Sequence, residues 1–355
     1  MDRTVAILGA GFSVAARLPT TAALLANFAT ALPTPSTPEW MQTEISAQLA
    51  KYWIAVFGWQ RRRRTPSFED HFTSLDLAAN TGHHLGRLYS PQKLRAIRRM
   101  SLHRVFETLD LRFGQSESIQ ALVNRLAIGE GNAIVTTNWD IVVERHLKWG
   151  AHQFYYGIPT EDLITGTAHQ NGIAVLKLHG SANWCYCDDC RRVFTSEDGK
   201  AAYKQWLFLE KRDFVALGAK AVAEHDEWES YPTGPKCPVC AVRLSARVAT
   251  FSFDKALGFF QFQGIWEESL RRLRSADRWI FIGHSLPAAD FELRQLLKTA
   301  QLAGRESRRL QIDVVLMGDT AAQKRFREFF GSRLMSLHTR GFEVWFEKEP
   351  GHAVV

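Results

Sequence analysis

The chain has 355 residues, enough for two or three domains or for one domain with insertions. Apolar residues make up 46% and charged residues 23%, which excludes a disordered, collagen-like or disulfide-scaffold chain. The formal net charge of +7 is a mild basic excess, well short of that of a histone-like chain. No apolar run approaches the roughly 20 residues that span a membrane.

The N-terminal stretch MDRTVAILGAGFSVAARL weakly resembles a signal peptide, because a basic residue precedes an apolar segment. We favour a first β-strand over 3–8 that runs into a glycine turn, since Gly9, Gly11 and Ser13 interrupt the apolar segment. The chain has five cysteines, an odd number, and four of them form CxxC pairs. This pattern favours a bound metal and a reducing compartment over disulfides, so a cytoplasmic location is expected.

Strand and helix patterns alternate along most of the chain. Strands are predicted over 3–8, 133–137, 173–178, 247–251, 279–283, 312–317 and 342–346. Helices are predicted over 20–32, 141–148, 201–223, 291–303 and 321–330. Apolar strands that alternate with helices indicate an α/β fold, a doubly wound parallel sheet of the Rossmann-like kind with helices on both faces.

Residues 39–112 depart from this alternation because their periodicity is helical. Phe68, Phe72 and Leu75 recur at helical spacing and indicate a buried helix face. Prolines within 33–38 end the preceding helix. The predicted organisation is a Rossmann-like nucleotide-binding domain over 1–32, 113–184 and 244–355, a helical insertion over 33–112, and a zinc-binding module over 185–243.

A glycine-rich turn, GAGFS at 9–13, follows the first predicted strand. Glycines at this position let the backbone approach a pyrophosphate, toward which the next helix points its N–H groups. The third glycine of the usual dinucleotide fingerprint is missing, and no convincing acidic residue follows about 20 positions later to hold a ribose. A tight strand-to-helix turn without a ligand explains the pattern about as well.

Three further motifs end predicted strands, where ligands bind in a doubly wound sheet. TTNWD offers Asn138 and Asp140, which could hold a carboxamide or place a water, although such residues often only cap a helix. LHGS offers His179 as a base near neutral pH, although a lone histidine is more often structural. GHSLP at 283–287 could line a phosphate or ribose pocket or be an ordinary loop.

Two CxxC pairs, Cys187 with Cys190 and Cys237 with Cys240, suit a tetrahedral four-thiolate zinc site. The stretch between the pairs is longer than the roughly 15–20 residues of a compact zinc ribbon. A closed four-sulfur site has no open position, so the metal would be structural rather than catalytic. Cys185 is left over. Chance spacing is the main alternative, and two pairs among five cysteines argue against it.

Taken in order, GAGFS, TTNWD, LHGS, the two CxxC pairs and GHS resemble the sirtuin family, whose members consume NAD on a Rossmann-like fold. Sirtuins show a GAG-x-S turn, a T-x-N-x-D segment, an HG catalytic histidine, two zinc-binding CxxC pairs and a later G-[ST]-S loop, in that order. The resemblance covers most of the chain, except the helical insertion and the stretch between the CxxC pairs. It implies NAD as the substrate and a structural zinc.

The resemblance also implies roles for individual residues. Asn138 and His179 would be catalytic: Asn138 would place the attacking water or the nicotinamide, and His179 would be the base next to the nicotinamide ribose. The residues expected to contact NAD are Ala10, Gly11, Ser13, Thr137, Asp140, Gly283, Ser285 and Gly318. Asp319, next to Gly318, would also lie near the adenosine. The expected zinc ligands are Cys187, Cys190, Cys237 and Cys240.

Two segments depart from the protein-deacylating sirtuins. After the first turn these carry G-[IL]-P-D-F-R, where this chain has RLPTT at 17–21, and their F-G-E segment, which pairs with the acyl-lysine peptide, corresponds to FSFD at 251–254. The chain therefore looks more like the bacterial sirtuin-like domains of antiphage systems, which hydrolyse NAD and halt an infected cell. The expected reaction releases nicotinamide and ADP-ribose. The alternatives are an NAD-dependent protein-lysine deacylase and a non-catalytic subunit that binds NAD or nucleic acid.

Most of the excess positive charge lies in the helical insertion, including four consecutive arginines at 61–64. This region could bind nucleic acid, dock another protein or be a solvated arginine-rich face, and we favour the last because one short run is weak evidence. The resemblance implies a homo-oligomer or a complex with a partner ATPase or sensor protein. No membrane partner is expected.

Overall fold

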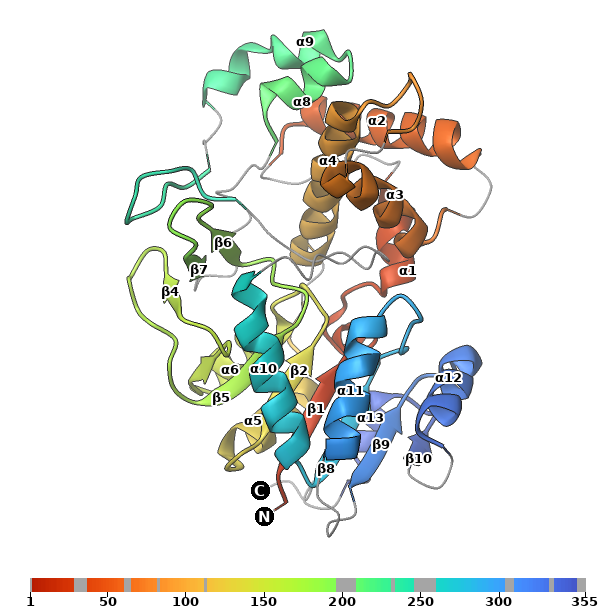
Figure 1. The fold of residues 1–355 in the computed structure, drawn as a ribbon, viewed down its shortest axis with the longest axis vertical. Coiled ribbons are helices and arrows are strands. Elements are labelled where there is room, and N and C mark those ends of the chain that lie inside the picture. Colours follow the sequence, from red (N-terminus) through yellow and green to blue (C-terminus); the bar gives the residue numbers. More distant parts are fainter. Residues whose placement is uncertain are drawn as a thin grey trace.

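In a computed structural model of the chain, the described residues are 2–28, 37–60, 65–81, 84–111, 114–195, 209–230, 234–245, 260–303, 310–331 and 335–349. A parallel sheet with its covering helices forms one half of the molecule, and a helical body lies beyond the carboxyl ends of the strands (Figure 1). No helix in the described ranges combines the length and apolar character needed to cross a lipid bilayer.

Within the described residues, the main sheet has seven strands, and every neighbouring pair is parallel. In sheet order these are β10 (Met335–His338), β9 (Gln311–Val315), β8 (Arg278–Ile282), β1 (Thr4–Leu8), β2 (Ala133–Thr136), β5 (Ile173–Lys177) and β3 (Phe154–Tyr155). The chain leaves β1 toward β2 and later returns to β8 on its other side, so the strand order reverses between β1 and β8. In open α/β sheets, ligands bind at the carboxyl ends of the strands at this switch point.

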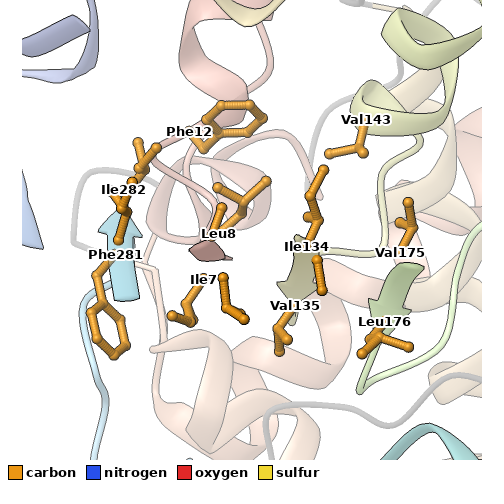
Figure 2. Packing of buried hydrophobic residues seen from close by; sticks show 14 of the residues in the cluster. Ile7, Leu8, Phe12, Ile134, Val135, Val143, Val175, Leu176, Phe281 and Ile282 are labelled. Atoms are coloured by element: carbon orange, nitrogen blue, oxygen red, sulfur yellow. The ribbon is translucent and has the colours of Figure 1, made fainter. Parts of the chain in front are cut away.

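Helices cover the sheet, which explains why its central strands are apolar on both faces. Figure 1 shows α10 (Phe260–Ser275) and α11 (Phe291–Ala303) side by side in front of the sheet. The other helices of this half are α5 (Glu117–Ile128), α6 (Val142–Trp149), α12 (Thr320–Phe330) and α13 (Phe342–Phe346). In Figure 2, consecutive residues of each central strand, such as Ile7 and Leu8, point to opposite faces.

The helical body has a second hydrophobic core of its own. It contains α1 (Thr21–Leu24), α2 (Glu39–Phe57), α3 (Phe68–Thr81) and α4 (Pro91–Leu111), together with α8 (Lys211–Ala216) and α9 (Lys220–Ala223). The last two helices come from the stretch between the CxxC pairs and pack on α4 and α2. Arg99 of α4 fixes this contact, because its Nε lies 2.9 Å from a carboxylate oxygen of the buried Asp213.

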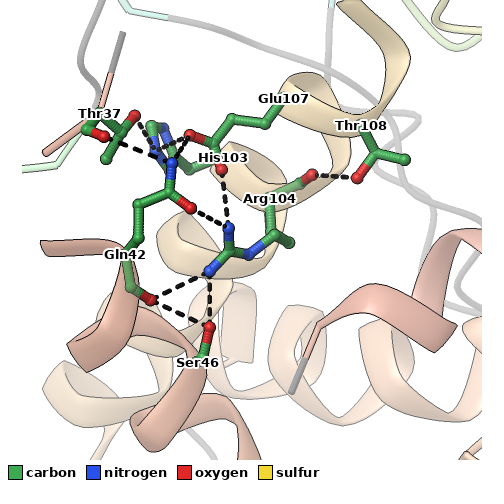
Figure 3. Close-up of polar contacts among 7 residues, drawn as sticks. All are labelled: Thr37, Gln42, Ser46, His103, Arg104, Glu107 and Thr108. Carbon is green, nitrogen blue, oxygen red and sulfur yellow. Dashed lines mark hydrogen bonds and ion pairs between the residues drawn. The ribbon is translucent and has the colours of Figure 1, made fainter. Parts of the chain in front are cut away.

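A buried polar network joins α2 to α4 in this body (Figure 3). The Arg104 side chain is fully buried and donates to Ser46 Oγ at 2.8 Å, Gln42 Oε1 at 2.9 Å and Glu107 Oε2 at 3.0 Å. A guanidinium removed from water is costly unless it is paired and hydrogen-bonded. Glu107 of the same helix balances this charge, and the bonds to Gln42 and Ser46 of α2 fix how the two helices pack.

A small second sheet carries the first cysteine pair at its end. It consists of β4 (Thr160–Asp162), β7 (Val193–Thr195) and β6 (Trp184–Tyr186), and β6 runs antiparallel to β7. Cys187 follows directly after β6, and an isolated bridge from Tyr186 to Ser245 brings the chain that follows the second cysteine pair alongside.

The predicted α/β fold with a doubly wound parallel sheet is confirmed, but the predicted strand over 342–346 is wrong. This segment is α13, and its buried side chains Phe342, Trp345 and Phe346 recur at helical spacing. Their apolar run looks like a strand in the sequence, whereas the last strand within the described residues is β10, whose residues are partly buried or exposed.

The sequence analysis also missed α5, α10 and the short strands β3, β4, β6 and β7. After the glycine turn the chain forms a single 3₁₀ turn, η1 (Ser13–Ala16), and the helix predicted over 20–32 begins at Thr21. Parts of other predictions fall outside the described residues: 29–36, 61–64, 201–208 and the segment 246–259, with the predicted strand 247–251 and FSFD.

Candidate functional site

Two glycine turns meet at the switch point between β1 and β8. The Gly9 N–H donates to Ile282 O at 3.1 Å, and the Gly11 N–H donates to Gly283 O at 2.9 Å. Gly283 has a φ of 60°, and a Cβ there would lie 2.1 Å from the backbone nitrogen of Phe12. Only glycine allows this approach. GAGFS and GHSLP, far apart in the sequence, thus form one unit at the sheet edge.

Asn138 ties the β2 end to this unit. Its Nδ2 donates to Gly9 O at 2.9 Å and to Ser13 Oγ at 3.2 Å, and its side chain is buried. The backbone carbonyl of Gly9 can only accept, and Ser13 Oγ donates its own proton to Asp140 Oδ2 at 2.8 Å. Both partners therefore require the NH₂ group, which fixes the orientation of the amide. Within the part of the chain that the structure describes, no hydrogen bond to the carbonyl oxygen Oδ1 of Asn138 is found.

Asp140 is engaged on both carboxylate oxygens, since Oδ1 also accepts from the Val142 N–H at the start of α6, at 3.1 Å. Its backbone carbonyl accepts from Lys177 Nζ, and Lys177 forms a buried ion pair with Glu144 at 2.9 Å. Burial, reinforced by the negative charge of Glu144, raises the pKa of Tyr156 well above its usual value, so the phenol stays protonated and donates to Glu144. This buried network holds the TTNWD loop in place through the backbone carbonyl of Asp140.

His179 lies directly beyond β5, next to the β2 end, because the Leu178 N–H donates to Thr136 O at 3.0 Å. Its ring is fully buried, and Nε2 lies 3.3 Å from Oδ1 of Asp290, which is also fully buried. Asp290 precedes α11 and comes from the far side of the switch point. His284 of the GHSLP loop lies on the other carboxylate oxygen, with its Nε2 at 3.9 Å.

Trp139 connects this loop to the helical body. Its backbone carbonyl accepts from the Ala182 N–H at 2.8 Å, just after LHGS. Its buried ring lies in the core of the helical body, against Phe68, Phe72 and Phe106, with centroids 5.8–6.2 Å apart. The two polar residues on either side of Trp139 therefore sit at the junction of the sheet and the helical body.

The remaining predicted contact residues lie along the same edge of the sheet. Thr137 is buried beside Asn138, and Ala10 is partly exposed in the glycine turn. The backbone carbonyl of Ser285 accepts from Arg325 Nε at 2.8 Å. Gly318 is exposed beyond β9, with a φ of 68°, and Asp319 caps α12 through the Ala322 N–H at 2.8 Å. Their contacts with NAD stay predictions.

The four predicted zinc ligands come together. Cys187, Cys190, Cys237 and Cys240 place their sulfur atoms within 4.8 Å of one another. In a tetrahedral site with Zn–S bonds of about 2.3 Å, the sulfur atoms lie about 3.8 Å apart, so this donor set suits a structural zinc. Cys185 is buried outside the set. Among the described residues, these cysteines are the one such group that could hold a metal ion.

The two cysteine pairs share one backbone geometry. The residues after them, Arg191 and Ala241, both have a left-handed φ near 60°, and their N–H groups donate to Cys187 O and Cys237 O. Burial by itself would raise the pKa of the Cys237 thiol, but hydrogen bonds from the backbone N–H groups of Cys240 and Val239 outweigh it and lower that pKa to about 7. At Cys237 this turn favours the thiolate form, which is the form that binds metal.

The sequence analysis gave no individual role at this site to Lys177, Glu144, Trp139, His284 or Asp290. A polar residue at the end of an apolar strand was the available signal for Lys177. Asp290 gave no such signal, because its contact with His179 joins loops more than one hundred residues apart in the sequence.

No protein-family model and no curated protein match the sequence. Solved structures of Sir2 homologues do resemble the chain. A Sir2 homologue mutant in complex with 2′-O-acetyl ADP-ribose is 18% identical, with a TM-score of 0.43, over 97% of this chain and 89% of that one. A Sir2 homologue in complex with NAD is 17% identical, with a TM-score of 0.42, over 97% and 87%. Because these TM-scores are low, the fold is established by the chain's own sheet topology.

Proposed function

We propose that the chain is a sirtuin-type NAD glycohydrolase that cleaves the nicotinamide–ribose bond to give nicotinamide and ADP-ribose. The observation that carries the proposal is that Asn138 and His179 follow the ends of neighbouring strands, beside the switch point where the two glycine turns meet. The motif order GAGFS, TTNWD, LHGS and GHS supports NAD as the substrate, because each motif lies at this one edge of the sheet.

The reaction demands little acid catalysis. The nicotinamide–ribose bond breaks through an oxocarbenium-like transition state, as in glycoside cleavage, and nicotinamide leaves as a neutral molecule. The site must instead hold the ribose, exclude bulk water and admit one attacking water. The buried Asn138 and His179 suit these tasks.

Asn138 presents a carbonyl oxygen of fixed orientation, because both hydrogens of its amide are engaged by Gly9 O and Ser13 Oγ. This oxygen accepts a hydrogen bond from the attacking water or from the nicotinamide carboxamide. His179 accepts a proton from the ribose hydroxyls or the water, a role that typically contributes about 10²–10⁴-fold in rate.

Measuring nicotinamide release from NAD by the purified chain, without any acyl peptide, tests the proposal. We expect wild-type turnover and its loss in Asn138→Ala and His179→Ala, measured at a temperature where both variants are still folded. Lys51→Ala, an exposed residue of α2, serves as the control and should keep full activity. Near-normal turnover by either site variant contradicts the assigned role.

The same assay separates the alternatives. Turnover that requires an acyl-lysine peptide and yields an acylated ADP-ribose indicates a protein-lysine deacylase. Saturable NAD binding without products indicates a non-catalytic subunit.

The proposed biological role rests on the sequence resemblance to the sirtuin-like domains of antiphage systems. NAD depletion by this chain would serve antiphage defence, in a homo-oligomer or with a partner ATPase or sensor protein. The arginines at 61–64, for which nucleic-acid binding is an alternative to the favoured solvated face, lie outside the described residues.

A further inference from the structure

The contact between His179 and Asp290 crosses the sheet edge. His179 follows β5 and Asp290 follows β8, with the ends of β2 and β1 between these two strands. The two side chains nevertheless lie 3.3 Å apart, Nε2 to Oδ1, and each has 0% of its surface exposed. A pair of ionisable groups taken wholly out of water is maintained only by close complementarity.

Asp290 stands at the start of α11, where an acidic residue normally caps a helix at the surface. A cap in contact with water stabilises a helix without the cost of desolvating a carboxylate, which is several kcal/mol for a buried ion. Asp290 is instead buried between two imidazole rings. Capping alone therefore does not account for its position.

His284 anchors the carboxylate from the other side. Its Nδ1 accepts from the Leu286 N–H at 3.0 Å, so the proton of its neutral ring is on Nε2, the nitrogen 3.9 Å from Asp290 Oδ2. The backbone of His284 is packed against the glycine turn, since a Cβ at Gly9 would lie 2.5 Å from its Cα. Asp290 thus connects His179 to the turn expected to approach NAD.

We propose that Asp290 is the positioning residue of His179, and that its carboxylate fixes the ring and keeps the proton of the neutral imidazole on Nε2. The lone pair then lies on Nδ1, which becomes the basic nitrogen in the reaction. The inference rests on the proposed function, because the reaction defines what His179 must do. The inference goes beyond the proposed function because it assigns the orientation of the base to a residue that follows a different strand.

Asp290→Asn is the informative variant, because it keeps the size of the side chain and removes its charge. If His179 is wrongly oriented, it is a poorer base and kcat falls. KM should change little, because other residues make the contacts with the substrate. We expect kcat for nicotinamide release to fall roughly 10- to 100-fold, within the range of general-base catalysis, and KM for NAD to stay within about threefold.

Asp313→Asn is the matched control. Asp313 is also buried and pairs with an arginine, Arg278, at 2.6 Å, but lies within β9, away from the strand ends. Both substitutions remove a buried carboxylate and should lower the melting temperature, but only Asp290→Asn should change kcat by tenfold or more at a temperature where both variants are folded.

Nitrogen-15 NMR of histidine-labelled protein tests the pair without turnover, with the His179 signal assigned by its loss in His179→Gln. We expect the wild-type ring in the Nε2–H form and a change in this signal in Asp290→Asn. Wild-type kcat in Asp290→Asn, or an Nδ1–H ring in the wild type, overturns the inference. Absence of NAD cleavage by the wild type would instead refute the proposed function, while the ring signal would still report on the pair.

Discussion

At the scale of single residues, the site depends on backbone approaches that only glycine permits. Gly283 faces Phe12 and Gly11 at distances that leave no room for a side chain, and its φ is positive. Gly166, in the turn after β4, has a similar φ of 67°, but a Cβ at this position would have no other group within 4 Å. The two positions therefore separate the cost of the backbone conformation from the cost of a collision.

Gly166→Ala should lower the free energy of unfolding by about 1 kcal/mol, the cost of a left-handed residue other than glycine. Gly283→Ala should cost clearly more, since the backbone at Gly11 and Phe12 must also move apart. Urea denaturation of both variants checks this. Equal losses would show that the two turns separate easily, contrary to the contact described above.

At the scale of elements, one buried histidine holds three helices of the helical body together. His71 of α3 accepts from Trp53 Nε1 of α2 at 3.0 Å through Nδ1, and its Nε2 lies 2.8 Å from Ser101 Oγ of α4. Trp53 thus occupies the position where a second ring proton would be. Burial lowers the pKa of His71 to about 3, so the ring is neutral in the folded protein.

This pKa makes the stability of the fold depend on pH. Below about pH 6.5 the imidazole of His71 binds a proton in the unfolded chain but stays neutral in the folded chain. The contribution of the neutral His71 to stability is therefore complete above pH 6.5 and is lost as the pH falls toward 3. The loss approaches about 1.4 kcal/mol per pH unit. Urea unfolding at pH 7.5 and 5.5 measures it.

His71→Gln should be less stable at pH 7.5 but should lose less stability between the two pH values than the wild type does. The difference between the two proteins isolates His71 from the other histidines. Parallel losses in both would place the pKa of His71 near its ordinary value.

At the scale of the whole molecule, the cysteine set joins segments that the chain separates widely. Between Cys190 and Cys237 the chain leaves to form α8 and α9 on the helical body and then returns. A metal ion bound by both cysteine pairs therefore also restricts the conformational freedom of the segment between Cys190 and Cys237. Its effect should be on stability, because a closed four-thiolate site leaves no position for a substrate.

We expect about one zinc ion per chain by elemental analysis, lost in Cys237→Ser together with a lower melting temperature. Cys185→Ala is the matched control: it changes a buried cysteine of the same hydrophobic cluster that lies outside the four-sulfur set. It should keep its zinc. Loss of zinc from both variants, or from neither, would contradict the assignment of the ligands.

The sequence by itself determined the features whose signals are local. The apolar runs of β1, β2, β5, β8 and β9 predict buried parallel strands, because such strands are covered by helices on both faces. The glycine turn and the two CxxC pairs also follow from short-range chemistry. The motifs at the strand ends predict the edge of the sheet where a ligand binds, because parallel strands end at the same edge.

Only the tertiary structure decided which distant groups meet. No sequence spacing indicates that Asp290 reaches His179, that Trp139 packs into the helical body, or that α8 packs on α4. These contacts depend on how helices and loops pack across the sheet, and each side chain on its own is compatible with a cap, an ordinary core position or a solvated surface. The apolar segment 342–346 shows the same limit: packing, rather than composition, made it a helix.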